Sequence, residues 1–171
     1  MPGDLPKKLI TEFSPELAEP MAKIFQNIIK KQEWPSIWKK EYGIPLQKVP
    51  NPANEDQLRV ISLTPFFSKV FEKFVIEWLL FYIGDRIDWR QYGGQKGNSI
   101  AHYLIELINF ILYNQDLKDN HAVLAVLIDF SKAFNRQDHN ILITLLCDMG
   151  VPGWLLNIVA SFLKDRELLL R

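Results

Sequence analysis

The chain has 171 residues, of which 48% are hydrophobic, and its 20 basic residues balance 20 acidic residues. This composition is typical of a globular protein and excludes an intrinsically disordered chain. The zero net charge excludes a bulk field that attracts nucleic acid or membrane, so phosphate binding would depend on locally placed cations. The single cysteine, Cys147, excludes an internal disulfide.

Hydrophobic residues recur at helical spacing in several segments of the chain. Ser14-Pro15-Glu16 is typical of a helix start, because proline suits the first turn and the acid interacts favourably with the helix dipole. Gly150 and Pro152 are typical of a helix end. The predicted helices cover residues 17–29, 67–82, 100–112, 141–149 and 154–163.

Between these helices the sequence predicts strands. Residues 43–47 and 58–63 are expected to be two short strands on either side of a polar turn. Residues 122–129 are expected to be a strand buried on both faces, because an apolar run without alternation leads into Asp129. Residues 168–171 resemble the start of a further strand, so we expect the polypeptide to stop in mid-domain.

Asp129 is the strongest candidate for chemistry. An acid at the carboxyl end of a buried strand lies where sheet proteins build their sites, and its oxygens suit a hard cation such as Mg²⁺. The alternative is that Asp129 caps a short helical turn that begins at Ser131. The residues by themselves leave both interpretations open.

Three elements, in this order, resemble the reverse transcriptases of non-LTR (LINE-like) retrotransposons. The first is Leu58-Arg59-Val60-Ile61-Ser62-Leu63 with Lys69-Val-Phe-Glu72, the second is Gln91-Tyr-Gly93, and the third is Ile128-Asp129-Phe-Ser-Lys-Ala-Phe134. The middle element is short and unspecific, whereas the ordered set is specific. The resemblance extends over essentially the whole chain.

The resemblance implies an α+β fold, namely part of a right-hand polymerase. Residues 1–118 would form the helix-rich fingers, and residues 119–171 would form the first palm strand with the helices that follow it. The chain would then be truncated before the palm sheet is complete.

The resemblance also implies roles around the third element. Asp129 would be the catalytic, metal-binding carboxylate, and the backbone carbonyl of Phe130 would lie beside it as a further metal ligand. Phe134 would be the steric gate, because an aromatic ring under the sugar clashes with a 2'-hydroxyl and favours deoxynucleotides. Without the resemblance, a core aromatic is the preferred interpretation of Phe134.

Two further groups of residues receive roles from the same resemblance. Lys48 and Arg59 flank the turn between the short strands and would contact the triphosphate of a dNTP. The template contacts would be Gln91, Gly93, Lys96 and Asn98, around a glycine-rich turn. The alternatives are solvated loop charges for the first group and an ordinary polar turn for the second.

This chain also departs from the family pattern. Val60 stands where the family usually has proline, Gly94 where an aromatic is common, and Asn135 where an acid often follows the gate residue. The chain has no aromatic-x-Asp-Asp segment, which carries the remaining metal-binding acids in the family. One carboxylate cannot neutralise two divalent ions, so we expect this chain to be inactive by itself.

The predicted function is therefore that of a fragment of an RNA-directed DNA polymerase. The parent enzyme would use Mg²⁺ or Mn²⁺, an RNA template, a DNA primer and dNTPs, and we expect no membrane partner. The metal is expected in the complete parent enzyme rather than in this fragment. A non-catalytic relic that binds nucleic acid or another protein is the alternative. The sequence leaves the location open beyond an intracellular one, cytoplasm or nucleus.

Overall fold

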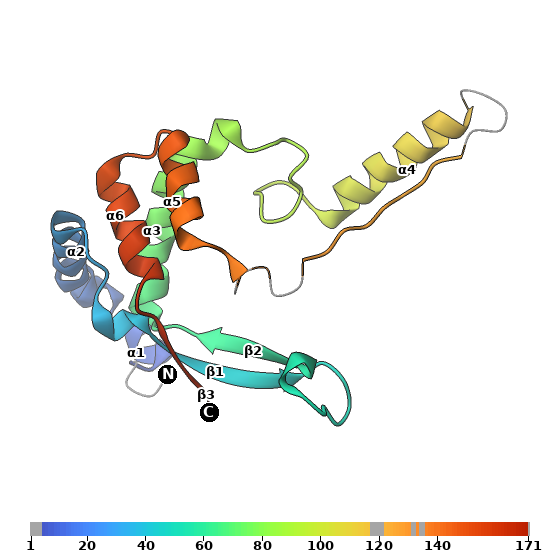
Figure 1. Ribbon diagram of the computed structural model, residues 1–171. Coiled ribbons are helices and arrows are strands. Elements are labelled where there is room, and N and C mark those ends of the chain that lie inside the picture. The colour runs from blue at the N-terminus through green and yellow to red at the C-terminus, as the bar shows by residue number, and fades with distance from the viewer. Residues whose placement is uncertain (1–4, 117–121, 131–132, 134–135, 171) are drawn as a thin grey trace. The chain divides into compact units, whose positions relative to one another are not determined.

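The computed structural model describes residues 5–116, 122–130, 133 and 136–170 (Figure 1). Its contacts divide the chain into two compact units, which are described separately below. The first unit contains residues 1–84 and 138–171, and the second unit contains residues 85–137. Phe134 lies outside the described residues, as does Ser131, so the steric-gate and cap predictions stay untested.

The first unit is mixed α and β. Its elements are α1 (Lys7–Glu12), α2 (Ser14–Lys31), β1 (Lys40–Gln47), β2 (Leu58–Leu63), α3 (Phe66–Ile83), α5 (His139–Asp148), α6 (Gly153–Leu163) and β3 (Glu167–Leu170), with short 3-10 helices at Ser36–Lys39 and Glu55–Gln57. The second unit contains α4 (Ile100–Asp116), and a 3-10 helix at Gly84–Arg86 spans the boundary between the units. This composition is compatible with the predicted α+β class.

The structure confirms the helices predicted from periodicity, and local chemistry explains where they begin and end. Asp138 caps the start of α5, because its side chain accepts hydrogen bonds from the backbone N–H groups of Asn140 and Ile141. It ends before Gly150, whose φ of 81° lies in the left-handed region that glycine adopts without strain. The short helix α1 was not predicted, because its six residues carry no capping side chain.

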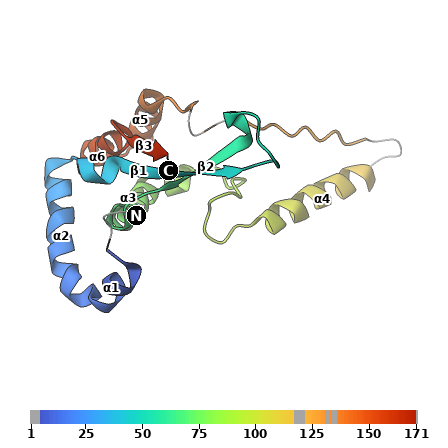
Figure 2. The same cartoon turned by 90° about the horizontal axis from the view of Figure 1, so that it is seen from below.

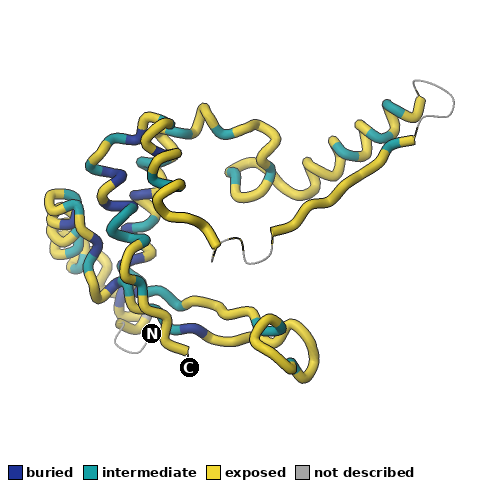
Figure 3. Tube along the Cα trace, in the orientation of Figure 1, coloured by how far each residue is buried: buried dark blue, intermediate teal, exposed yellow. Residues whose placement is uncertain are grey.

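The core of the first unit is formed mainly by α2, α3 and α6 with the segment after α2 (Figure 3). Phe71, Leu155 and Ile158 are completely buried. Trp34 and Trp38 are buried too, and the Trp34 ring contacts those of Phe71 and Phe162 with centroid distances of 5.1 and 4.7 Å. Both tryptophans are therefore packing residues.

The three strands form one sheet in the order β2-β1-β3. Strands β1 and β2 are antiparallel, which confirms the predicted hairpin, and β3 joins β1 in parallel, which confirms a strand at residues 168–170. Gly43 allows the close approach: a Cβ atom there would lie 2.8 Å from Val60 Cγ1 and 3.0 Å from Leu170 Cδ2. Ion pairs of Arg166 with Glu41 and of Lys40 with Glu167 also join β1 to the end of the chain.

The prediction of a buried strand at residues 122–129 is wrong in this structure. Residues 122–130 are described without strand pairing, and Leu124, Leu127 and Ile128 are 88%, 92% and 80% exposed. A buried strand needs hydrogen-bonded neighbours on both sides and apolar cover on both faces. The described strands all belong to the first unit, so the second unit provides no strand with which this segment can pair.

The second unit has a different character from the first. Both views show α4 and the segment 122–130 running alongside one another (Figures 1 and 2). Among its described residues, none is buried, and the large apolar side chains of α4 are half or more exposed at several positions. The apolar stripe of α4 was predicted correctly as helical, but it forms no buried core among these residues.

No helix in the described ranges combines the length and the apolar character needed to cross a bilayer.

Candidate functional site

The hairpin of β1 and β2 places two cations on one face. Leu46 is paired with Arg59, and beyond the last paired residues the Lys48 N–H donates to the carbonyl oxygen of Gln57 at 2.8 Å. Side chains of a strand alternate between faces, so Lys48 lies on the same face as Leu46 and therefore as Arg59. Diagonal neighbours of this kind have Cα atoms about 7–8 Å apart.

The hairpin tip is held by hydrogen bonds of its own. The Gln57 side chain accepts from the N–H of Ala53 at 2.6 Å, and Lys48 Nζ donates to the carbonyl oxygen of Asp56 at 2.9 Å. These bonds fix Lys48 near the tip while it stays exposed. The Arg59 side chain is exposed too, and it forms no hydrogen bond or ion pair with any residue that the structure describes.

This arrangement can bind phosphate. A guanidinium presents two parallel donors to phosphate oxygens, and a neighbouring ammonium adds a compact positive charge. Both groups are exposed, so an anion can bind to them without first displacing a buried partner. The structure brings Lys48 and Arg59 together although ten residues separate them in sequence.

The glycine-rich turn of the second unit is stabilised by the residues that were predicted to contact template. Gln91 Nε2 donates to the carbonyl oxygen of Gly93 at 2.9 Å, and Asn98 Nδ2 donates to the carbonyl oxygen of Gln91 at 3.4 Å. Gly94 and Gly97 have φ values of 75° and 86°, so both positions favour glycine. These amide donors hold the turn itself, whereas Lys96 is exposed.

Sequence reasoning missed two contacts that attach this turn to α4. The hydroxyl group of Tyr92 donates to Glu106, and this hydrogen bond raises the pKa of Tyr92 to about 12. The rings of Tyr92 and Tyr103 also lie with centroids 5.6 Å apart. Tyr92 is the middle residue of the Gln-x-Gly element, but nothing in the sequence pointed to an acid fourteen positions later as its partner.

Asp88 and Arg90 form a further local contact in the same turn region. Arg90 Nε and Nη2 donate to the two carboxylate oxygens of Asp88 at 3.0 and 2.6 Å. These side-chain hydrogen bonds lower the pKa of Asp88 to about 2. Both groups are exposed, so the contact orders a surface turn and does not bury charge.

Asp129 and Phe130 are both exposed, Phe130 at 77%. Among the described residues, no three His, Cys, Asp or Glu side chains are grouped closely enough to hold a metal ion. A two-metal site needs several carboxylates within reach of both ions, about 3.5–4 Å apart. The described residues around Asp129 therefore do not fit a complete metal site, and we assign no catalytic step to a metal here.

The chain is similar to the RNA-directed DNA polymerase from the mobile element jockey of Drosophila melanogaster. The two are 26% identical over 149 residues, which cover 85% of this chain and 16% of that relative's length. No family model matches the chain. The similarity supports the relationship to LINE-like reverse transcriptases that the ordered motifs indicate.

Proposed function

We propose that this chain is the fingers and first palm segment of a LINE-like RNA-directed DNA polymerase. The observation that carries the proposal is the pair of exposed cations, Lys48 and Arg59, on one face of the hairpin tip. The similarity to the jockey polymerase supports the same reading. The parent reaction is template-directed addition of deoxynucleotides to a DNA 3' end, with release of pyrophosphate.

In this proposal the hairpin binds the triphosphate of the incoming dNTP. Arg59 supplies bidentate hydrogen bonds, and Lys48, oriented by its bond to the Asp56 carbonyl, supplies a second charge. Phe134 excludes ribonucleotides, and the turn at residues 91–98 contacts the template through Lys96 and its exposed backbone. In the complete parent enzyme, Asp129 and the Phe130 carbonyl would hold a metal ion together with acids that this chain does not carry.

Nucleotide binding tests the hairpin directly. We expect a fluorescently labelled dNTP to bind the chain with a saturable change in anisotropy, and Arg59→Ala to weaken that binding at least tenfold, since a hydrogen bond to a charged group contributes about 1.5–3 kcal/mol. Lys30→Ala removes one positive charge from the end of α2, away from the hairpin, and should leave the affinity within twofold. Equal losses in both variants would refute a specific phosphate site.

Primer extension tests the inactivity of this chain. With Mg²⁺, dNTPs and an RNA template annealed to a DNA primer, we expect no extension, because Asp129 is the single acid of the site that the chain carries. Template-dependent products that Asp129→Asn abolishes would contradict this expectation. Binding of RNA or DNA that depends on Lys48 and Arg59, without dNTP binding, would favour the non-catalytic alternative.

A further inference from the structure

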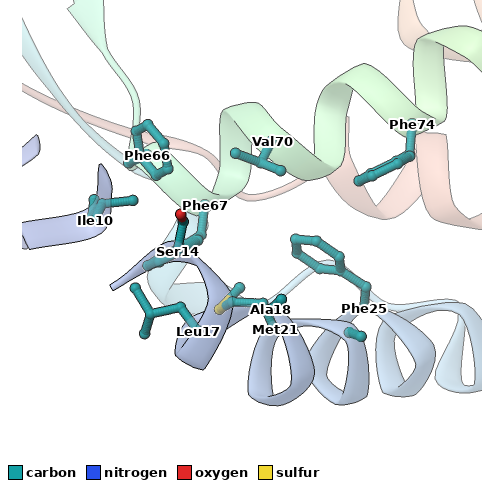
Figure 4. A pocket seen from close by; sticks show the side chains of 11 residues that line it. Ile10, Ser14, Leu17, Ala18, Met21, Phe25, Phe66, Phe67, Val70 and Phe74 are labelled. Atoms are coloured by element: carbon teal, nitrogen blue, oxygen red, sulfur yellow. The ribbon is translucent and has the colours of Figure 1, made fainter. Parts of the chain in front are cut away.

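The pocket between α2 and α3 has mainly apolar walls. It has a volume of about 390 Å³, with Phe25 on one side and Val70 and Phe74 on the other (Figure 4). Its polar side chain, Ser14, already donates to the carbonyl oxygen of Thr11 at 3.1 Å. Apolar walls by themselves do not specify one ligand, because specificity depends on a few well-placed polar groups. The tip of the hairpin differs in this respect, since hydrogen bonds orient its polar groups.

Gln57 joins several parts of the hairpin tip, which comprises residues 48–57. Its carbonyl oxygen accepts from the N–H of Lys48 at 2.8 Å, and its own N–H donates to the carbonyl oxygen of Asn54 at 3.2 Å. Its side-chain Oε1 accepts from the N–H of Ala53 at 2.6 Å. Gln57 is half-buried, whereas Lys48 and Ala53 are exposed. Gln57 therefore attaches the turn to the end of β1.

The residue before Gln57 provides the acceptor that orients Lys48. Lys48 Nζ donates to the carbonyl oxygen of Asp56 at 2.9 Å. The position of this carbonyl depends on the hydrogen bonds at Gln57, because the backbone joins the two residues directly. An ammonium group has three donors, so the bond to Asp56 leaves two for phosphate oxygens. A lysine that is already oriented loses less side-chain freedom when it binds an anion.

We propose that Gln57 is a positioning residue for nucleotide binding and that it acts through Lys48. The inference rests on the proposed function, in which Lys48 and Arg59 bind the triphosphate of a dNTP. The Gln57 side chain holds the turn at Ala53, and the turn holds the Asp56 carbonyl against the Lys48 ammonium group. Strand register places the Lys48 side chain on the same face as Arg59.

Gln57→Met tests this role. Methionine keeps the length of the side chain but replaces the amide oxygen by a weak acceptor, so the bond from Ala53 is lost. We expect the labelled dNTP to bind about fivefold more weakly, since Lys48 then loses its side-chain freedom only on binding. Gln47→Met is the matched control, because Gln47 is exposed on the opposite face of β1 from Lys48, and it should leave the affinity within twofold. Equal losses in both variants would overturn the proposal.

A double-mutant cycle distinguishes positioning of Lys48 from a general effect on the hairpin. In a Lys48→Ala background, Gln57→Met should change the affinity by less than twofold, because the side chain through which Gln57 acts has been removed. In an Arg59→Ala background, the loss of about fivefold should persist. A loss of the same size in the Lys48→Ala background would mean that Gln57 holds the whole hairpin, and would overturn the proposal.

Arg59→Ala also separates this inference from the proposed function. If Arg59→Ala weakens binding and Gln57→Met does not, the hairpin binds the nucleotide and only the role of Gln57 is wrong. If the unmodified chain gives no saturable binding, or Arg59→Ala has no effect, the proposed function fails and this inference fails with it.

Gln57→Asn provides a second variant in case Gln57→Met does not fold. Asparagine keeps the amide group but is shorter by one methylene group, so its oxygen moves away from the N–H of Ala53. We expect the same loss of affinity of about fivefold, with an unchanged melting curve by circular dichroism. Unchanged affinity in Gln57→Asn, or failure of both variants to fold, would overturn the proposal.

Discussion

The two units differ in how far they bury two helices of similar length and pattern. Helix α3 in the first unit and α4 in the second have 18 and 17 residues, and both carry regularly spaced apolar side chains. Helix α3 buries Ser68, Phe71 and Val75, whereas α4 buries no residue. The difference shows that periodicity decides that a segment is helical and which side is apolar, while burial depends on other elements that meet that side.

Replacement of a large apolar side chain by alanine should give the largest difference in stability loss between the two units. Phe71→Ala removes a completely buried ring from the core of the first unit, and we expect it to lower the free energy of unfolding by about 3–5 kcal/mol. Phe110→Ala removes the same ring from α4, where Phe110 is 60% exposed, and should change the free energy by less than about 0.5 kcal/mol. Urea denaturation followed by circular dichroism measures both values.

A large loss of stability in Phe110→Ala would mean that α4 is packed against other elements in solution. The contrast between the units would then be wrong.

The start of α5 gives a smaller effect within the first unit. Asp138→Ala removes the acceptor for the N–H groups of Asn140 and Ile141, and we expect a loss of about 1 kcal/mol. Asp138→Asn keeps an acceptor oxygen and should retain most of the stability, as measured by the same denaturation experiment. If both variants lose the same stability, the charge of Asp138 rather than its hydrogen bonds stabilises the helix.

The ion pair of Asp88 with Arg90 should give the smallest effect, since it is exposed in the second unit. The pKa of Asp88 is lowered from its ordinary value of 3.8, so the ion pair is intact above pH 3.8 and is lost as the pH falls through about 2. NMR titration of the Asp88 carboxyl group should show this pKa, and Arg90→Gln should raise it toward 3.8. Added salt should raise the pKa of Asp88 in the unmodified chain, because salt screens exposed ion pairs. An unchanged pKa in Arg90→Gln would mean that the shift has another cause.

Much of the secondary structure follows from local chemistry. The residues after Pro65 form a helix because apolar positions recur every three to four residues, and Gly150 ends α5 because its backbone has a positive φ. The hairpin could likewise be predicted from two short apolar segments around a polar turn. These features depend on neighbouring residues, so the sequence is sufficient to predict them.

The candidate site was only partly predictable. Lys48 and Arg59 were selected by their positions beside the turn, and strand register then places them on one face. The bond between Tyr92 and Glu106, and the one between Ser68 and Glu72, were not foreseen. No pattern of spacing marks such a contact, because its partners meet only when the backbone has already folded.

The sequence by itself determined the helices α2 to α6, the hairpin and the ordered motifs that relate this chain to LINE-like reverse transcriptases. Only the tertiary structure decided which apolar residues are buried: Phe71 lies in a core, whereas Leu127 is 92% exposed. The physical reason is that hydrophobicity determines the free energy that a side chain gains on leaving water, but it does not determine which other element will bury that side chain. For residues 122–129 to form a buried strand, neighbouring strands would also have to supply hydrogen bonds.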